Sequence, residues 1–226
     1  MTINTKTLAA IDIGTNAIRL FISNVEEYPT ETLFKKIAFL RVPIRLGEDV
    51  FTTGEIGQQK RKRLCETMQG FSYIMSAFNV ESYKAYATCA MREARNGKSV
   101  AEQIQKECDL NIEIISGTKE AETIFAGGMN EVVDDDKTYL YVDVGGGSTE
   151  VIVYSKSVKV EACSFPLGTV RMLNDAVDKE EMKHFKKWLK NITEKYTPDA
   201  IIGSGGNINK IHKLLNKKER ERMSKI

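Results

Sequence analysis

Short apolar runs, each closed by a polar turn, alternate along the chain with segments of helical period. This alternation is typical of an α/β protein. Residues 7–13 form one such run, which ends at the turn residues Gly14, Thr15 and Asn16, and residues 17–25 form a second run directly after it. Two strands joined by so short a polar turn predict a β-hairpin.

The remainder of the first half predicts helices and strands in alternation. A strand is expected at residues 41–46, and apolar residues at helical spacing predict a helix over 56–78. The basic run 60–63 on that helix is expected to be a solvated face. A strand, a helix and a strand are then expected at 80–87, 100–108 and 111–115.

The second half repeats this alternation. Strands are expected at 138–143, 149–154, 158–164 and 200–202. Helices are expected at 119–132, 170–176 and 180–196, and after the glycines of 203–206 as far as Leu215. The three aspartates at 134–136 predict a solvated turn rather than a metal site.

The composition is that of a globular protein with little overall charge. The chain has 226 residues, 42% of them hydrophobic, and 33 Lys+Arg against 31 Asp+Glu give a net charge of +2. This balance gives no general attraction to nucleic acid or to a membrane surface, so neither is expected as a partner. The four cysteines form no CxxC pair, and no apolar run reaches membrane-spanning length. We therefore expect free thiols and a cytoplasmic location.

Two segments of the chain carry the same motif. In Leu8–Asn16, and again in Leu140–Thr149, an apolar strand ends in an aspartate, one apolar residue follows, and a turn rich in glycine and hydroxyl groups comes next. The two aspartates, Asp12 and Asp143, are 131 positions apart (143 − 12), which is the spacing of a duplicated domain. A single copy would indicate an ordinary turn, whereas two copies at this spacing favour a shared function.

The residue types of this motif are those that bind phosphate. Glycine lets the backbone approach a ligand closely, and successive N–H groups in such a turn form an anion-binding nest. A carboxylate beside a phosphate repels it unless a cation lies between them, so Asp12 and Asp143 imply Mg²⁺. The turn residues predicted to bind phosphate are Gly14, Thr15, Asn16, Gly145, Gly146, Gly147, Ser148 and Thr149.

Six motifs, in order along the chain, resemble those of one family of phosphohydrolases. They are Asp12–Leu20, Ala87–Asn96, Ile115–Ala121, Asp143–Glu150, Pro166–Arg171 and Gly203–Gly206. Over residues 8–206 the chain resembles the exopolyphosphatase / guanosine pentaphosphate phosphohydrolase family of the actin-like ATPase superfold. Sugar kinases and actins share only the two hairpins and the late glycine pair.

The resemblance implies an α/β fold of two duplicated ribonuclease H-like (actin-like ATPase) domains, in which mixed sheets are flanked by helices. The first domain is expected at residues 1–120 and the second at 121–226, each with one phosphate hairpin. Family members typically continue well beyond the late glycine motif, so the second domain is expected to be incomplete. Relatives often pair, and a homodimer is therefore implied.

The resemblance also implies roles for four carboxylates. Glu120, after the Ser-Gly pair, is expected to be the base that activates water. Asp143 is expected to ligate Mg²⁺ together with Asp12. Glu150 is expected to serve either the metal or the water.

Two arginines, Arg92 and Arg19, are implied to contact phosphate oxygens, a task suited to the planar fork of a guanidinium group. Arg171 fits packing beside the site and contact with substrate equally well. Lys119 stands where the family usually has an acid. In relatives that bind ATP, the adenine of the nucleotide would lie near the late glycines, here Gly203, Gly205 and Gly206.

Three functions are open on the sequence. The leading one is Mg²⁺-dependent hydrolysis of a terminal phosphate from polyphosphate or guanosine pentaphosphate. The second is an ATPase or kinase of the same superfold, although no sugar pocket can be read from the sequence. The third is a protein that binds polyphosphate or a guanosine penta- or tetraphosphate alarmone without hydrolysing it.

Overall fold

The computed structural model describes residues 4–126, 134, 136–156 and 158–214. The chain divides into two compact units, residues 1–115 and 116–226. The division falls before Glu120, whereas the sequence suggested a boundary after it. The reason is that the helix carrying Glu120, α5 (Gly117–Ala126), packs against strands of the second sheet.

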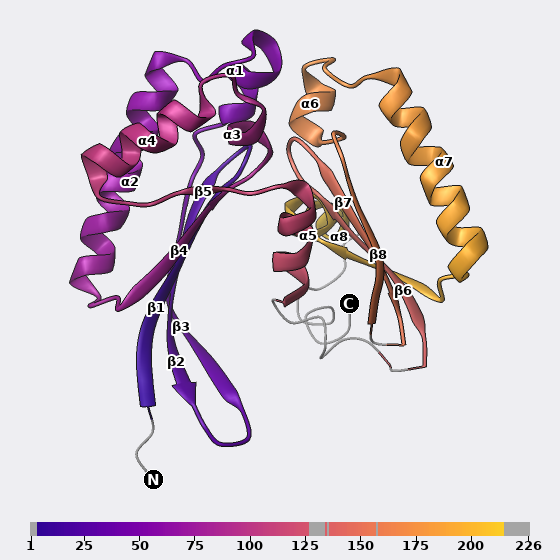
Figure 1. The fold of residues 1–226 in the computed structure, drawn as a ribbon, viewed down its shortest axis with the longest axis horizontal. Coiled ribbons are helices and arrows are strands. Elements are labelled where there is room, and N and C mark those ends of the chain that lie inside the picture. The colour runs from indigo at the N-terminus through magenta and orange to yellow at the C-terminus, as the bar shows by residue number, and fades with distance from the viewer. Residues whose placement is uncertain (1–3, 127–133, 135, 157, 215–226) are drawn as a thin grey trace. The chain divides into compact units, whose positions relative to one another are not determined.

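The first unit is a five-stranded mixed sheet with helices (Figure 1). Its strands are β1 (Asn4–Ile13), β2 (Ile18–Glu27), β3 (Thr32–Val42), β4 (Ser82–Ala87) and β5 (Glu113–Ile114), in the order β3-β2-β1-β4-β5. β1, β2 and β3 pair antiparallel, and β4 and β5 add to β1 in parallel. The helices are α1 (Leu46–Thr53), α2 (Gln58–Ala77), α3 (Cys89–Glu93) and α4 (Gly97–Cys108).

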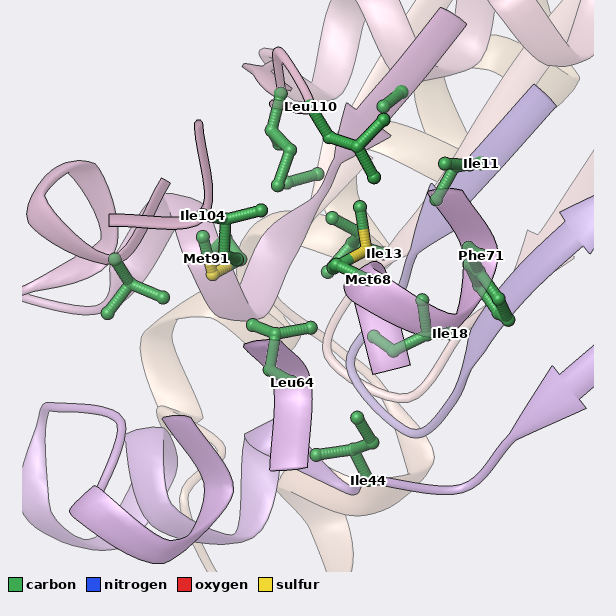
Figure 2. Close-up of a cluster of buried hydrophobic side chains, with 14 of the residues drawn as sticks. Ile11, Ile13, Ile18, Ile44, Leu64, Met68, Phe71, Met91, Ile104 and Leu110 are labelled. Carbon is green, nitrogen blue, oxygen red and sulfur yellow. The ribbon is translucent and has the colours of Figure 1, made fainter. Parts of the chain in front are cut away.

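The core of this unit lies between the sheet and α2 with α4. Ile11 and Ile13 of β1 and Ile18 of β2 meet Leu64 and Met68 of α2 there, as Figure 2 shows. The periodic apolar positions of the predicted helix are the ones that pack into this core, so the helical pattern is confirmed. This packing holds the β1–β2 loop at the end of a rigid sheet.

The second unit is a four-stranded sheet in the order β8-β7-β6-β9. Its strands are β6 (Thr138–Val144), β7 (Thr149–Ser155), β8 (Val158–Phe165) and β9 (Ala200–Ser204), and its helices besides α5 are α6 (Thr169–Leu173), α7 (Lys179–Tyr196) and α8 (Gly205–Leu214). Both sheet faces are covered. One carries Tyr141 and Ile152 with Ala121 of α5, and the other carries Val151 and Val153 with residues of α7.

The two units share one topology. In each, three antiparallel strands are followed by a short helix and a long helix, and a fourth strand then adds in parallel to the first. The sequence shows similarity only in the hairpins, yet the structure extends the duplication to the whole β-β-β-α-α-β order. This confirms the predicted fold class, with two related halves built on mixed sheets.

The structure also corrects several predictions. The strand expected at 41–46 is wrong: β3 occupies 32–42, Pro43 follows it, and residues 46–53 are helical. The short helix α3, inside the Ala87–Asn96 motif, was not predicted. The predicted helix at 119–132 is confirmed as far as residue 126, and its remainder lies outside the described residues, as do Asp135 of the acidic turn and Leu215 at the end of the last helix.

The basic run 60–63 is not uniformly solvated. The Lys60 side chain is 14% exposed, whereas that of Lys62 is 77% exposed. Lys60 therefore belongs to the interior side of α2. In the part of the chain that the structure describes, no helix is both long and apolar enough to cross a membrane.

Candidate functional site

The two predicted phosphate loops have the same local geometry. The Gly14 N–H donates to the Ala17 carbonyl at 3.2 Å, and the Gly145 N–H donates to the Ser148 carbonyl at 2.9 Å. A Cβ on either glycine would lie 3.1 Å from that same carbonyl oxygen, so both turns are tight at the corresponding position. The sequence duplication is thus a duplication of structure at the loop itself.

In the second loop, the carbonyl groups of Gly145–Gly147 are tied to α6. Thr169 N–H donates to the first carbonyl at 3.1 Å, and Val170 N–H donates to the second at 2.8 Å. The third accepts a 3.0 Å bond from Nε of the buried Arg171. Arg171 thereby holds the loop, which explains its place in the Pro166–Arg171 motif.

The direction of these carbonyls fixes the direction of the N–H groups. In a planar trans peptide the N–H points opposite to the C=O of the same peptide unit. With the carbonyls of residues 145–147 turned toward α6 and Arg171, the N–H groups of Gly146, Gly147 and Ser148 point the other way. Three successive donors on one side of a loop form an anion-binding nest.

The first loop is held in the same manner by the segment that enters α1. The Thr15 carbonyl accepts from Gly47 N–H at 3.0 Å, and the Asn16 carbonyl accepts from Arg45 N–H at 2.9 Å. The N–H groups of Asn16 and Ala17 therefore point away from α1. Thr15 is buried with its methyl group against Gly47, where a Cβ on the glycine would come within 2.4 Å.

The cross-strand partners of the two aspartates differ in charge. Asp12 and Arg19 are cross-strand neighbours joined by a 2.5 Å ion pair, with side chains 42% and 44% exposed. The corresponding neighbours in the second hairpin are Asp143 and Glu150. The first hairpin thus carries a neutral pair, whereas the second carries two carboxylates.

The second pair lies in a polar cluster on one face of the sheet. Glu150 is 2% exposed and accepts a 2.8 Å bond from the Ser164 hydroxyl. Tyr141 lies two residues before Asp143 on the same face and donates to Ser204. Burial raises the pKa of the Tyr141 hydroxyl, the bond to Ser204 lowers it, and the charges of Asp143 and Glu150 raise it further.

The Asp143 carboxylate lies against the start of α8. A Cβ on Gly205 would come 2.5 Å from Asp143 Oδ1, and the backbone of Gly205 is left-handed with φ +86°. Both facts require glycine at this position. Asn207 donates to the Val144 carbonyl at 2.5 Å and so ties α8 to the end of β6.

The carboxylates of Asp143 and Glu150 suit Mg²⁺, which usually takes one or two carboxylates and completes its shell with water and phosphate oxygens. Two like charges directly across a strand pair repel each other, and a bound cation would relieve this at Asp143 and Glu150. Among the described residues, no group of three His, Cys, Asp or Glu side chains is arranged to hold a metal by itself.

Arg92 belongs to the first unit and Glu120 to the second. Arg92, on α3 at the carboxyl end of β4, donates from Nη1 to the Ile115 carbonyl at 2.8 Å. Ser116 directly precedes α5 and caps it: its hydroxyl accepts a 3.1 Å bond from Lys119 N–H. Glu120 lies on the first turn of that helix.

Within each unit, most of the predicted residues meet at the carboxyl ends of the parallel strands, where α/β sheets bind ligands. Thr149 is an exception in role, because its hydroxyl donates to the Leu167 carbonyl at 2.5 Å and so holds the loop. Gly203 lies against Ile208, and Gly206 faces open space. Sequence reasoning missed Ser164 and Tyr141. Ser164 is brought beside Glu150 by strand register, and Tyr141 shares a face with Asp143 because it lies two residues earlier on β6.

Comparison with known proteins gives one family. The family model described as the Ppx/GppA phosphatase family matches residues 22–215. A bifunctional 3-dehydroquinate synthase/phosphatase of Fusobacterium nucleatum is 32% identical over 168 residues, covering 73% of this chain and 25% of that protein. A putative exopolyphosphatase of Haemophilus influenzae is 28% identical over 167 residues, covering 74% of this chain and 50% of that protein.

A solved structure agrees with these matches. The crystal structure of an exopolyphosphatase from Cytophaga hutchinsonii superimposes with a TM-score of 0.81 at 25% identity, covering 96% of this chain and 72% of that one. The chain thus spans between a quarter and a half of the two curated relatives described above.

Proposed function

Since the chain belongs to the Ppx/GppA phosphatase family, we propose that it removes the terminal phosphate from a phosphoanhydride chain, either inorganic polyphosphate or guanosine pentaphosphate. The observation that carries the proposal is the anchoring of both hairpin loops through their carbonyls. Such anchoring leaves preorganised N–H donors, which stabilise the charge of phosphate oxygens without reorganising during the reaction.

Mg²⁺ is the proposed cofactor, with Asp143 as its ligand and Glu150 beside it. When bound, the ion neutralises phosphate charge and polarises the phosphoryl group. Asp12 fits this task less well, because its carboxylate is already paired with Arg19. In the first hairpin the proposed role of Asp12 is to hold the Arg19 guanidinium at the loop, where it would face phosphate oxygens.

Glu120 is the proposed general base. It takes a proton from water as the water oxygen bonds to the terminal phosphorus, while the bridging P–O bond breaks and its electrons stay on the shortened chain. Its helix covers the sheet face that carries Tyr141, and the strand register places Asp143 and Glu150 on that same face. A carboxylate on this helix can therefore act together with the acidic pair.

Arg92 is proposed to contact phosphate oxygens from the end of β4. One of its nitrogens is bonded to the Ile115 carbonyl, which orients the guanidinium group. Lys119, beside Glu120, adds positive charge on the same turn and favours a strongly anionic substrate.

The test compares turnover with binding. Glu120→Gln removes the base while keeping the size of the side chain, so phosphate release from polyphosphate and guanosine pentaphosphate should fall at least about 10²-fold. The dissociation constant for polyphosphate should stay within about threefold of wild type, because the binding loops are unchanged. Glu122→Gln is the matched control, because it makes the same change from carboxylate to amide on the same helix at a side chain that is 46% exposed.

Each outcome separates the proposal from its alternatives. Unchanged turnover in Glu120→Gln would refute its role as base. Binding of polyphosphate by the wild type with no phosphate released would instead favour a protein that binds without hydrolysis. Release from ATP that exceeds release from polyphosphate would favour an ATPase of the same superfold.

A further inference from the structure

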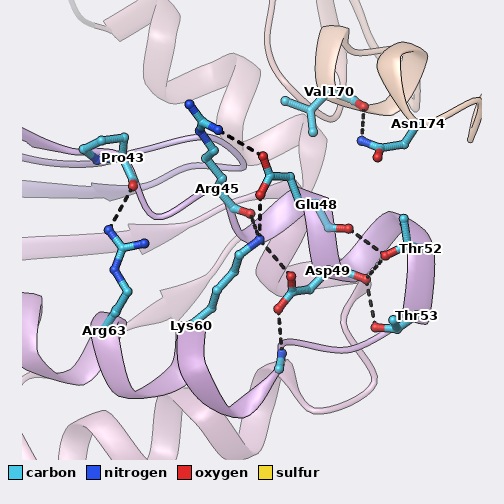
Figure 3. A network of polar contacts seen from close by, with 11 residues as sticks. Pro43, Arg45, Glu48, Asp49, Thr52, Thr53, Lys60, Arg63, Val170 and Asn174 are labelled. Atoms are coloured by element: carbon cyan, nitrogen blue, oxygen red, sulfur yellow. Dashed lines mark hydrogen bonds and ion pairs between the residues drawn. The ribbon is translucent and has the colours of Figure 1, made fainter.

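Lys60 lies outside both hairpin loops, yet its ammonium group makes three polar contacts. It lies 2.6 Å from the Arg45 carbonyl, 3.0 Å from Glu48 Oε2 and 2.8 Å from Asp49 Oδ1 (Figure 3). A lysine ammonium has three hydrogens to donate, and these three acceptors match them. Lys60 is therefore fully engaged by the segment that precedes and begins α1.

The segment that Lys60 holds has an unusual backbone. Arg45 is left-handed, with φ 59° and ψ 52°, a conformation disfavoured for a residue with a Cβ. Its carbonyl is bonded to Lys60. Asp49, which Lys60 also contacts, accepts a 3.0 Å bond from Gly57 N–H and so joins the start of α1 to the start of α2.

The same segment holds the first phosphate loop. Arg45 N–H and Gly47 N–H donate to the carbonyls of Asn16 and Thr15. Arg45 is thus bonded through its carbonyl to Lys60 and through its N–H to the loop. If Lys60 were removed, the Arg45 carbonyl would keep its 3.1 Å bond from Glu48 N–H but lose the shorter one from Lys60. The left-handed turn that donates to the loop carbonyls would then be held less firmly.

We propose that Lys60 is a positioning residue for the first phosphate loop: it sets the Arg45–Gly47 turn, which in turn points the N–H groups of Asn16 and Ala17 toward bound phosphate. This inference rests on the proposed function and deepens it. In the second loop, Arg171 holds the loop directly, through its bond to the Gly147 carbonyl. In the first loop, a lysine on the following long helix acts through the intervening turn.

A general loss of stability would be a different effect. α2 is anchored in the core by Leu64, Met68 and Phe71, all of them at most 2% exposed. Its packing does not need Lys60. Replacement of Lys60 should therefore loosen the turn and the loop while the helix stays in place.

The experiment uses Lys60→Met, which removes the charge and keeps the length of the side chain. Lys62→Met is the matched control, because Lys62 lies on the same helix but is 77% exposed. We expect the dissociation constant for tripolyphosphate, measured by isothermal titration calorimetry, to rise about tenfold in Lys60→Met and to stay within twofold in Lys62→Met. Lys60→Arg, which can donate to the same acceptors, should restore most of the affinity.

Steady-state kinetics give the second readout. Loss of a positioned binding loop raises KM for the hydrolysed substrate with kcat nearly unchanged, whereas a smaller folded fraction lowers kcat and leaves KM as it was. A Lys60→Met protein with wild-type affinity and KM would overturn the inference while leaving the proposed function intact. A wild-type chain that binds neither tripolyphosphate nor guanosine pentaphosphate would refute the proposed function itself.

Discussion

Gly168 offers the sharpest test of the loop geometry, because it touches the second phosphate loop without being part of it. Its backbone is extended, with φ −144° and ψ 159°, so alanine would meet no dihedral penalty. Its Cβ, however, would lie 2.4 Å from Gly146 C, Gly146 O and Gly147 N. Gly168→Ala therefore acts only through steric repulsion against the peptide between Gly146 and Gly147.

The size of the displacement follows from the contact distance. Ordinary contact begins at 3.4 Å, so the loop and the residue before α6 must separate by 3.4 − 2.4 = 1.0 Å. Overpacking of this kind costs about 1–3 kcal/mol of stability. A displacement of about 1 Å in a group that positions substrate lowers the rate about 10²-fold. We expect kcat/KM to fall by about that factor in a protein that still folds.

The assay is phosphate release by malachite green, with thermal unfolding measured on the same preparations. Gly70→Ala is the control: Gly70 is a helical glycine in α2 with nothing within 4 Å of its added Cβ. That variant should be as active as wild type and about 0.5–1 kcal/mol more stable. If Gly168→Ala folds and keeps wild-type kcat/KM, the second loop does not position phosphate in the way inferred here.

Two further predictions concern buried polar groups. Arg171→Ala leaves the Gly147 carbonyl without its side-chain donor, so it should lower the free energy of unfolding by about 1.5–3 kcal/mol and raise KM for polyphosphate. The control is Asn174→Ala at the C-terminal end of α6, where the side chain donates to the Val170 carbonyl of its own helix, and equal KM values in the two variants would contradict the reasoning. Burial raises the pKa of the Cys65 thiol from 9.0 to about 11, so its contribution to stability is complete below pH 9 and is lost as the pH rises toward 11. Iodoacetamide at pH 8 should accordingly alkylate Cys65 about 10²-fold more slowly in the native protein than in urea, as followed by peptide mass spectrometry, and equal rates would refute this.

The sequence predicted the elements that have strong periodicity on one buried face. β1, β2 and α2 all pack into the same core, and their apolar spacing reflects this. β3 was misplaced because it is an edge strand whose residues 32–37 are exposed on both faces, so it shows no alternation. The helix α1 was missed because it depends on a left-handed Arg45 rather than on a side-chain cap.

For the site, the sequence predicted the loops but not what holds them. Glycine and hydroxyl residues are visible in a motif, whereas the donors that orient their carbonyls come from distant parts of the chain: Arg171 lies 24 residues after Gly147, and Arg45 lies 29 residues (45 − 16) after Asn16. A basic run is normally a solvated face, and only the three-dimensional contacts separate Lys60 from Lys62. The same applies to Ser164 and Glu150, which meet only through strand register.

The central claim is that this chain hydrolyses a terminal phosphoanhydride through loops preorganised for phosphate. The most direct measurement is phosphate release from long-chain polyphosphate and from guanosine pentaphosphate in parallel, with Mg²⁺ and with Mg²⁺ removed by chelation. We expect Mg²⁺-dependent release from at least one of the two substrates. No release from either one, with Mg²⁺ present and the protein shown to be folded, would contradict the claim.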